Sequence, residues 1–465
     1  MSSQSPDYIN PFEPVVLRLA STASASSPLE VHVLPYGLTI HRLVIDDGKE
    51  DLITGPESPS DHHTLGRSFF GPIVGRFANR LPAGQNSFNY DSTEVGSVDL
   101  PEWGGDGVCH HGGPAVGGEQ EGAGEPVKAK KGQLLPQRGP FDRMVWTKLE
   151  EGQMQLFDKL AEGEPQSKAI FALHSIGAPA GHQGFHGDIR IEVRIALKAA
   201  KAEQAETTSH TKLLHDSGAS SSGSVSIEYR ASLLPRSSEV QVTPFNLTHH
   251  WGFNLTASQA KDEASSRIDD HQLRLLPSDV GRLALDERGI ATGEILKLDE
   301  AHGWTSSPSS SPWGKRVATA MPQQGYDDFY LWPTAAGNDT ASLPAVALLS
   351  SPASSSSAPR TSLVFRTDQH GVQFYSANGQ PAAPAPPEES GGARKLAHRR
   401  DGEQQEGNAM RTAAFLEFGE PHCCFLRPRL QEFVRASKDV GLLRKGETYV
   451  NRVEVEIWQS KAQKA

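Results

Sequence analysis

The feature that most constrains the fold is a strict alternation of apolar and polar residues in several segments. In "DIRIEVRIAL" (188–197), Ile189, Ile191, Val193 and Ile195 alternate with polar and charged residues. This period of two places the apolar side chains on one face of a half-buried strand. The segments "SVSIEYRASL" (224–233) and "NRVEVEIW" (451–458) repeat the pattern, and "SLVFRTDQHGVQFYSANG" (362–379) predicts two strands around a turn that contains glycine. No segment sustains a 3.6-residue apolar period, so we predict an all-β fold, built as a large β-sandwich.

Four segments lack any strand pattern. They cover residues near 114–138, 202–223, 349–360 and 380–410, and they are rich in Gly, Ser, Pro, Ala or charged residues. Such composition offers too little apolar surface to offset the entropy of ordering the chain. Because strand patterns lie on both sides of each segment, we interpret residues 1–465 as a single domain with flexible surface inserts.

Composition narrows the partners and the compartment. The net charge is −11 and no long Lys/Arg cluster is present, which argues against binding to nucleic acid or to an anionic membrane. No apolar run reaches the roughly 18 residues of a membrane-spanning helix, and the N-terminus does not resemble a signal peptide. Three cysteines make no disulfide framework. We therefore expect a cytoplasmic protein, either a monomer or a weak dimer.

Two polar clusters lie in the first third of the chain. In "GPIVGRFANRLPAG", Arg76, Asn79 and Arg80 follow a predicted strand and offer donors and acceptors that suit a polyhydroxylated ligand. An arginine in a surface salt bridge is the simpler interpretation. In "VCHHGGP", His110 and His111 precede two glycines, which would let the backbone turn and expose the imidazoles to a cleft.

Three more clusters follow. In "NLTHHWGFNL" (246–255), His249 and His250 must point to opposite faces of an extended strand, so at most one of them faces a given site. In "QGYDDFYLW", Asp327 stands beside aromatic residues, a pairing common in sugar sites. In "AAFLEFGEPHCC", Glu417 lies inside an apolar run, where burial would raise its pKa toward that of a general base. A glutamate that faces water on an edge strand remains the alternative.

Metals and nucleotide cofactors find no support in the sequence. No His or Cys pair has the spacing of a structural zinc site, and Cys423 and Cys424 are adjacent, which is a poor geometry for shared ligation. Neither a GxGxxG after a strand nor a GxxxxGK[ST] is present. We therefore expect neither a metal nor a cofactor.

Taken in order, these segments resemble the aldose 1-epimerase (galactose mutarotase) family. "GRFANRL" is similar to the family's GRxANRI, "CHHGG" with "GPFDRMVW" to its LHGG and GFDxxxW, and "NLTHHWGFNL" to NLTNHSYFNL. "ATGEI" is similar to PTGEI, "GYDDF" to GYDHxF, and "FLEFG" to the LExQ around the catalytic glutamate. The resemblance spans most of the chain, from residue 34 to residue 458.

The resemblance implies a β-supersandwich and an isomerase that interconverts the α and β anomers of free hexoses such as glucose or galactose. His250 matches the family's general acid and Glu417 its general base. The matching sugar-binding positions are Asn79, Arg80, His111, Asp327 and Gln373. Anomer exchange requires one base at O1 and one acid at the ring oxygen, which these residue types supply without a metal or a redox cofactor.

Three departures lie close to these positions. Gly252 stands where the family has Tyr, Asp328 where it has His, and Gly419 where it has Gln. They leave two alternatives open: an epimerase of sugar phosphates, which needs an added basic cluster at the cleft, and a non-catalytic sugar-binding or regulatory protein on the same fold.

Overall fold

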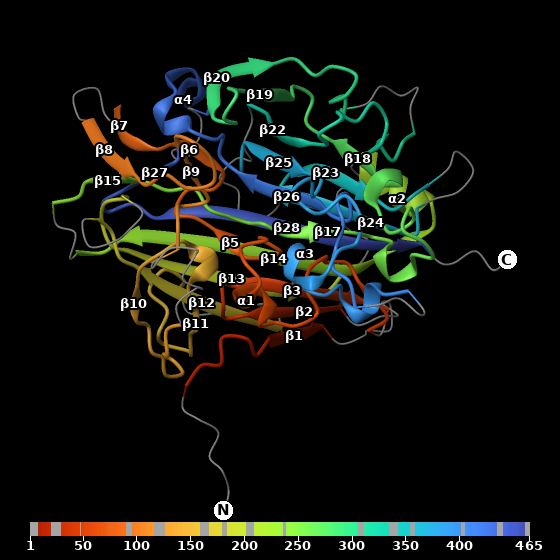
Figure 1. Ribbon diagram of the computed structural model, residues 1–465, viewed down its shortest axis with the longest axis horizontal. Coiled ribbons are helices and arrows are strands. Elements are labelled where there is room, and N and C mark those ends of the chain that lie inside the picture. The colour runs from red at the N-terminus through yellow and green to blue at the C-terminus, as the bar shows by residue number, and fades with distance from the viewer. Residues whose placement is uncertain are drawn as a thin grey trace, which may run out of the picture.

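The computed structural model is built almost wholly from β-strands (Figure 1). It describes residues 8–19, 29–46, 48–89, 95–115, 126–158, 167–178, 184–200, 209–235, 239–305, 311–333, 343–353, 359–400, 405–434 and 440–460. The α-helices of these residues are short: α1 (Asp61–Thr64), α2 (Ser209–Asp216), α3 (Pro387–Ser390) and α4 (Pro428–Phe433). The all-β prediction is confirmed. No helix in these ranges is long and apolar enough to cross a bilayer.

A ten-stranded sheet forms one layer of a sandwich. Its strands run in the order β10-β12-β13-β14-β28-β24-β23-β18-β21, and β11 pairs with β12 at one end. Their bounds are β10 (Pro136–Gln137), β11 (Thr147–Lys148), β12 (Ser167–Ser175), β13 (Ile189–Lys198), β14 (Ala219–Leu233), β18 (Gln272–Leu275), β21 (Lys315–Arg316), β23 (Ala345–Ser350), β24 (Thr361–Thr367) and β28 (Tyr449–Ser460). Nearly all neighbours in this sheet are antiparallel; β10 and β12 are parallel.

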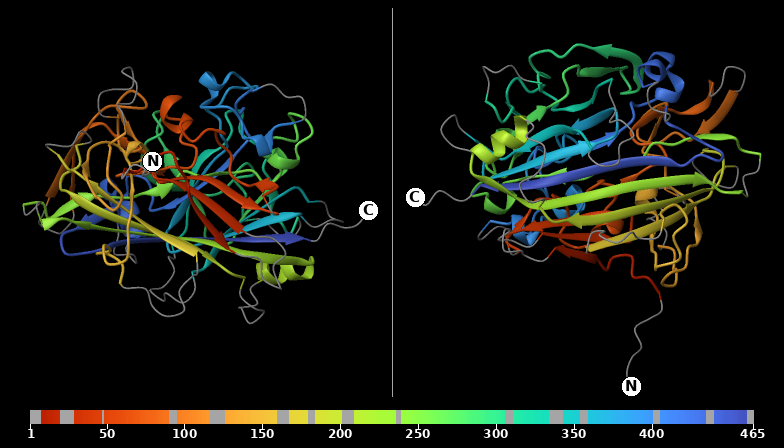
Figure 2. Two further views of the ribbon diagram at one scale, coloured as in Figure 1. Left: turned by 90° about the horizontal axis from the view of Figure 1, so that it is seen from below. Right: turned by 180° about the vertical axis from the view of Figure 1, so that it is seen from behind.

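The second layer consists of a six-stranded and a four-stranded sheet on the same side of the large sheet (Figure 2). The six-stranded sheet has the order β17 (Gly252–Phe253), β26 (Ala414–Gly419), β25 (Gly371–Tyr375), β22 (Asp327–Leu331), β19 (Gly281–Leu285) and β20 (Ala291–Leu296). The four-stranded sheet joins β1 (Val15–Leu19), β2 (Leu29–Leu34), β3 (Thr39–Ile45) and β4 (Glu50–Asp51). Four strand pairs complete the fold: β5 (Ile73–Val74) with β16 (Thr248–His249), β6 (Arg80–Pro82) with β9 (Val108–His110), β7 (Gly84–Asn89) with β8 (Val95–Leu100), and β15 (Val242–Pro244) with β27 (Leu442–Arg444).

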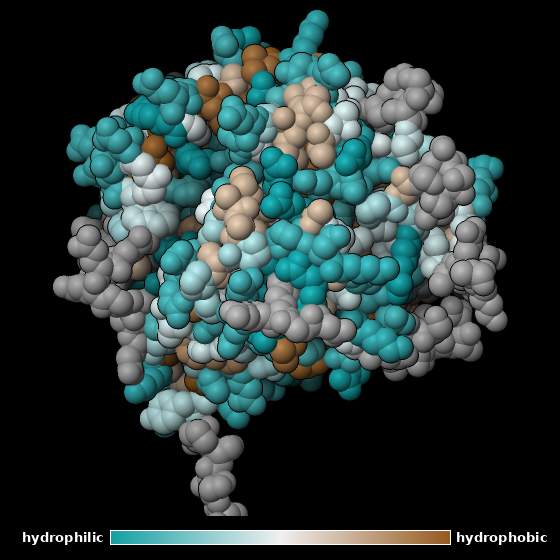
Figure 3. All heavy atoms as spheres, turned by 45° about the vertical axis from the view of Figure 1, so that its right-hand side comes forward, coloured by the Kyte–Doolittle hydropathy of each residue, from teal (hydrophilic) through white to brown (hydrophobic). Residues whose placement is uncertain are grey.

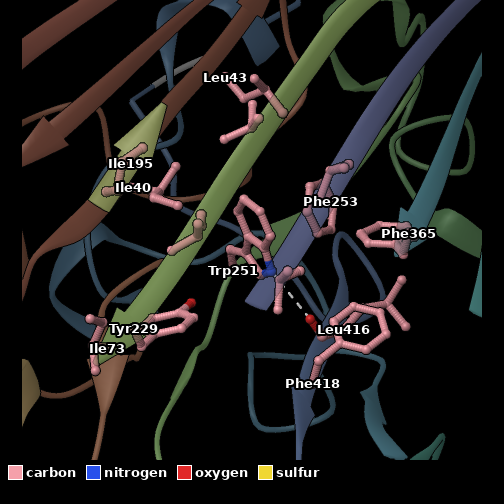
Figure 4. Close-up of a cluster of buried hydrophobic side chains, with 14 of the residues drawn as sticks. Ile40, Leu43, Ile73, Ile195, Tyr229, Trp251, Phe253, Phe365, Leu416 and Phe418 are labelled. Carbon is pink, nitrogen blue, oxygen red and sulfur yellow. Dashed lines mark hydrogen bonds between the residues drawn. The ribbon is translucent and has the colours of Figure 1, made fainter. Parts of the chain in front are cut away.

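The alternation seen in the sequence places the core between the layers. On β13, Ile191, Val193 and Ile195 are fully buried, and Val193 lies opposite Tyr229 of β14. Figure 4 shows that the core also includes the side chains of Trp251, Phe253 and Phe365, which come from both layers. Burying each such side chain stabilises the fold by about 1.5–3 kcal/mol relative to leaving it exposed. Polar residues predominate on the face shown in Figure 3.

The chain passes between the two layers within one predicted strand pair. Strand β24 ends at Thr367 and pairs with β23 and β28 in the large sheet. Strand β25 begins at Gly371, only four residues later, but pairs with β22 and β26 in the six-stranded sheet. The two strands predicted around a turn therefore belong to different layers. This crossing places β25 in the sheet that carries the candidate site.

The prediction of an insert with few buried contacts at 380–410 is wrong for the residues described there. This segment contains α3 and a short 3₁₀ turn at Leu396–His398, and it reaches the four-stranded sheet. The ammonium group of Lys395 is fully buried and donates to Asp51 Oδ2 at 2.9 Å and to the carbonyl of Ile53 at 2.6 Å. His398 Nε2 bonds to the carbonyl of Asp51 at 2.7 Å. Polar residues anchor this segment through buried hydrogen bonds, which a hydropathy pattern does not reveal.

Part of the predicted insert at 202–223 is also regular structure. Helix α2 covers residues 209–216, and β14 begins at Ala219, within the stretch that was too small and polar to predict as a strand. A register shift between Ser221 and Gly223 accommodates these residues in the pairing with β28. Residues 116–125, 202–208, 354–358 and 401–404, which belong to the four predicted inserts, lie outside the described residues.

Candidate active site

Strands of the six-stranded sheet and its neighbouring strand pairs bring the predicted polar residues together. Gln373 of β25 lies directly opposite Glu417 of β26, and Phe329 of β22 lies opposite Gln373. Residues at the same register share a face, and Asp327, two residues before Phe329, shares it too. The other candidates come from strand ends: Arg80 opens β6, His111 follows β9, and His250 lies in the bend between β16 and β17.

His250 and Glu417 form the centre of this arrangement. His250 Nε2 lies 3.3 Å from Glu417 Oε1, and the two side chains are 8% and 4% exposed. The other ring nitrogen of His250, Nδ1, is buried and has no hydrogen-bond partner among the described residues. In this part of the chain, Glu417 is therefore the carboxylate that contacts the imidazole.

Burial shifts the two groups in opposite directions. It lowers the pKa of His250 to about 4. It also raises the pKa of Glu417 well above its usual range; the negative charge of Asp327 adds to this rise and the positive charge of Arg80 opposes it. Near neutral pH the pair therefore holds one proton between two atoms 3.3 Å apart. Whichever atom carries that proton, one group is an acid and the other a base.

Asp327 forms a polar shelf beside the pair. Its Oδ1 accepts a hydrogen bond from Gln373 Nε2 at 2.6 Å, and its Oδ2 accepts one from Arg80 Nη1 at 3.2 Å. The Oε1 atom of Gln373 is buried and accepts no hydrogen bond. A cavity also reaches Gln373 and Glu417 from the side of Phe329 and His422. Asp327 is 37% exposed, so the shelf can exchange these bonds for bonds to the hydroxyl groups of a ligand.

Aromatic rings enclose His250, and the sequence did not single them out. The ring centroid of Phe415 lies 4.7 Å from that of His250, and the centroid of Phe69 lies 5.6 Å away. Phe69 also contacts the ring of His111, at 4.8 Å. Phe415 precedes Glu417 by two on the same strand, so strand alternation alone could have found it. Nothing in the sequence near Phe69 signals its role, because this contact is made only in the folded chain.

His249 lies outside this site. Its Nδ1 accepts a hydrogen bond from the hydroxyl of Tyr229 at 2.6 Å, and its Nε2 donates to the carbonyl of Leu38 at 2.9 Å. Both ring nitrogens are thus used in the core between the two layers. The expectation that only one histidine of the pair can face the site agrees with this placement.

Two expectations from the first clusters need correction. Arg76 is neither a ligand group nor a surface salt bridge: it is 1% exposed, and it donates to Ser175 Oγ at 3.0 Å and to the carbonyl of Gly187 at 2.7 Å. It ties the segment before β6 to the large sheet. His111 is 2% exposed, so the glycines after it do not leave its imidazole open to solvent.

The same residues have the geometry of a cation site. His111, His250 and Glu417 each offer one ligand atom, and these three atoms lie within 4.8 Å of one another. Two imidazoles and a carboxylate are a common ligand set for Zn²⁺. The expectation of a metal-free site stays a prediction. The hydrogen bonds of His111 decide whether its ring nitrogens are available to a metal.

Known proteins are similar to this chain in sequence and in fold. The sequence model of the aldose 1-epimerase family matches residues 220–427. Over these residues, the chain is similar to the aldose 1-epimerase family. The galactose mutarotases of Rattus norvegicus and Homo sapiens are 23% and 24% identical to it over 276 residues, which are 59% of this chain. The chain spans 56% of the length of these relatives.

Two solved structures have the same fold as this chain. A GalM/aldose epimerase homologue from C. elegans superposes with a TM-score of 0.58 at 16% identity, covering 96% of this chain and all of its own. Galactose 1-epimerase from Lactobacillus acidophilus superposes with a TM-score of 0.56 at 16% identity, covering 97% of this chain and 99% of its own. The prediction of a galactose mutarotase-like sandwich is confirmed.

The three departures from the family motifs have different surroundings. Gly252 lies against the ring of Phe415, where a β-carbon would stand 2.7 Å from the ring, so a larger side chain does not fit. Asp328 accepts a hydrogen bond from Arg282 at 2.8 Å and lies 3.5 Å from His302, away from Asp327. Gly419 borders the cavity beside Glu417. None of the three removes the contact between His250 and Glu417.

Proposed function

We propose that this protein is an aldose 1-epimerase that interconverts the α and β anomers of a free aldohexose such as glucose or galactose. The observation that carries the proposal is the buried contact of His250 with Glu417 at 3.3 Å, beside the exposed shelf of Asp327. Anomer exchange needs a base that reaches O1 and an acid that reaches O5, two oxygens bonded to the same carbon, and His250 and Glu417 lie side by side. The shelf offers hydrogen bonds to sugar hydroxyls.

The pKa shifts favour the proton of the pair on Glu417, so the reacting form is the one in which this proton has moved to His250. In the proposed reaction, Glu417 as carboxylate takes the proton from the O1 hydroxyl while His250 as imidazolium gives a proton to the ring oxygen O5. The C1–O5 bond breaks and C1 becomes an aldehyde carbon. Rotation about C1–C2 presents the other face of the aldehyde. The 5-hydroxyl then attacks C1, His250 recovers its proton, and Glu417 returns one to O1. The pair ends in its starting state, so no other reactant is consumed.

A neutral sugar suits the charges around the site better than a sugar phosphate. Arg80 is paired with Asp327, and Arg67, on the far side of Phe69, is paired with Asp142 through two bonds of 2.8 Å. Each of these arginines is thus matched by a carboxylate. A phosphate would have to compete with that partner, whereas hydroxyl groups can both donate to and accept from such pairs.

Polarimetry tests the proposal. Freshly dissolved α-glucose and α-galactose should equilibrate faster with the protein than without it. Glu417→Gln and His250→Asn should each lower kcat by about 10² or more, the usual contribution of a positioned proton-transfer group. Circular dichroism spectra would show that both variants are folded.

Two results would contradict the proposal. If Glu417→Gln keeps most of the anomerase rate, the pair does not carry the chemistry. If the wild-type protein binds hexoses but accelerates none of them, the fold serves sugar binding alone. If hexose 6-phosphates are turned over faster than free hexoses in the same assay, the substrate class is sugar phosphates and not free sugars.

A further inference from the structure

Two residues with left-handed backbone conformations face each other at the edge of the site. Asn79 has φ of 64° and His111 has φ of 46°. The amide of Asn79 donates to His111 Nδ1 at 3.0 Å, and the amide of His111 donates to the carbonyl of Asn79 at 3.1 Å. Such values of φ are uncommon for residues other than glycine, and asparagine and histidine are among those that tolerate them best.

The first of these bonds fixes the form of the His111 ring. A backbone amide can only donate, so Nδ1 must present its lone pair and cannot carry a proton. With Nδ1 unprotonated, the ring is neutral, and burial, which lowers the pKa of His111 well below its usual range, favours the same form. A neutral imidazole carries one proton, and with Nδ1 excluded that proton resides on Nε2.

The side-chain oxygen of Asn79 forms a hydrogen bond within the turn. Its Oδ1 accepts the amide N–H of Arg80 at 2.9 Å, the residue that begins β6. The whole residue is 4% exposed. This bond and the left-handed backbone hold the turn that presents the amide of Asn79 to His111, and they leave Oδ1 engaged within the protein.

We infer that Asn79 is a positioning residue that acts through its backbone amide and makes His111 a fixed Nε2–H donor toward the site, rather than a sugar ligand in its own right. Under the proposed function, this donor forms a hydrogen bond to an oxygen of the bound sugar next to the His250–Glu417 pair. This assignment rests on the proposed function, whereas the protonation state of the His111 ring does not. The same proton occupies the atom that a metal would need. His111 therefore does not ligate a divalent cation while its bond to Asn79 persists.

The ring state can be measured without any substrate. In protein labelled with ¹⁵N at histidine, two-bond proton–nitrogen correlation spectra distinguish protonated from unprotonated ring nitrogens, and His111→Gln assigns the signals. We expect an unprotonated Nδ1 and a protonated Nε2 for His111 at neutral pH. The opposite tautomer, or a charged ring, would overturn the inference even if the enzyme is active.

Substitution of Asn79 separates the backbone role from a side-chain role. Asn79→Gly keeps the amide and favours the left-handed conformation, so the His111 signals should stay close to those of the wild-type protein. Asn79→Val keeps the amide but is a poor left-handed residue, so the tautomer signature should weaken and kcat should fall. If Asn79→Gly leaves the signals unchanged but raises KM about tenfold, the loss expected for one hydrogen bond, then the side chain binds sugar and the inference is wrong.

A zinc titration completes the test. Calorimetry of the wild-type protein with ZnCl₂ should show no binding that His111→Gln removes. Stoichiometric binding that His111→Gln abolishes would show that Nε2 is available as a ligand, and would overturn the inference. If the tautomer is as expected but no hexose is turned over, the proposed function fails and the role of Asn79 stands.

Discussion

The shifted pKa values of His250 and Glu417 set the pH range in which the acid–base pair can act. The reaction needs one proton on the pair. At low pH both groups are protonated and no base remains, so kcat/KM should fall as the pH drops toward the pKa of His250, about 4. At high pH the pair loses its proton, and because the pKa of Glu417 is raised, this loss lies well above the usual range of a carboxyl. A bell-shaped profile measured by polarimetry is expected; a profile that is flat across both limbs would contradict it.

Replacing Asp327 should move the alkaline limb of that profile. Asp327 is the second cause of the raised pKa of Glu417, after burial, and Asp327→Asn removes its negative charge. The free-energy cost of ionising Glu417 then falls, so the pair loses its proton at lower pH. Arg80→Met removes a positive charge and should move the same limb to higher pH. The position of the limb, and not the rate alone, is the measurement, since both residues are also expected to bind sugar; shifts in the same direction for both variants would refute the electrostatic account.

His249 should matter for stability and not for turnover. His249→Asn breaks two buried bonds and leaves the Tyr229 hydroxyl and the Leu38 carbonyl without their partner. Each lost partner costs about 1–3 kcal/mol. Urea denaturation should therefore show a clear loss, while kcat for the folded protein stays near wild type. Tyr229→Phe, which removes only the hydroxyl bond, should cost less; a drop in kcat comparable to that of His250→Asn would contradict this assignment.

The sequence could predict where the chemistry-bearing residues stand, but only part of what they do. Glu417 inside an apolar run already indicated burial and a raised pKa, and the adjacency of His249 and His250 already required opposite orientations. Asn79 was predicted as a sugar ligand, and the sequence did not reveal that its Oδ1 accepts the amide N–H of Arg80. The left-handed backbone that explains this is set by the meeting of β6 and β9, which no local pattern encodes.

At the scale of elements, the buried Lys395 is one of the anchors of the segment 380–400. Asp51, the partner of Lys395, also accepts bonds from Arg42 at 3.3 Å and from the amide of Leu43 at 3.2 Å. Lys395→Ala leaves this carboxylate buried with its main counter-charge removed, and should destabilise the fold by about 3–5 kcal/mol. The free energy of unfolding from urea titration is the measurement.

Matched variants identify the cause. Lys395→Met keeps the apolar stem but removes the charge, and Lys395→Met combined with Asp51→Asn removes both charges. The double variant should recover part of the stability that Lys395→Met loses, because no uncompensated charge is left buried. If all three variants are as stable as wild type, the segment is dispensable, as its composition first suggested.

This element also shows where sequence patterns fail. Strands β13, β14 and β28 were predicted because burial on one face repeats every second residue. The segment 380–400 has no such repeat, since it is held by hydrogen bonds from Lys395 and His398 to backbone carbonyls. Composition reports how much apolar surface a segment can bury, and it does not report polar anchors of this kind.

At the scale of the whole molecule, one hydrophobic core joins the sheets. It includes Val31 of the four-stranded sheet, Val193 and Val455 of the ten-stranded sheet, and Phe374 and Leu416 of the six-stranded sheet. The site lies on the layer that this core supports, and the chain reaches it by crossing from β24 to β25. The sandwich itself could be predicted from alternation, but the pairing of the strands could not, because partners such as β14 and β28 are more than two hundred residues apart.

A core shared by all three large sheets predicts that residues 1–465 unfold as one domain. Loss of the four-stranded sheet would expose the large sheet, which could not remain folded with its inner face in water. Trp146 and Trp251 are buried in this core and report its packing, whereas far-UV circular dichroism reports the strands. In urea, tryptophan fluorescence and circular dichroism should therefore give coincident single transitions with the same midpoint. Two separated transitions, or a protease-resistant fragment that keeps the six-stranded sheet and its rate of anomer exchange, would show that the chain contains two independently folding units.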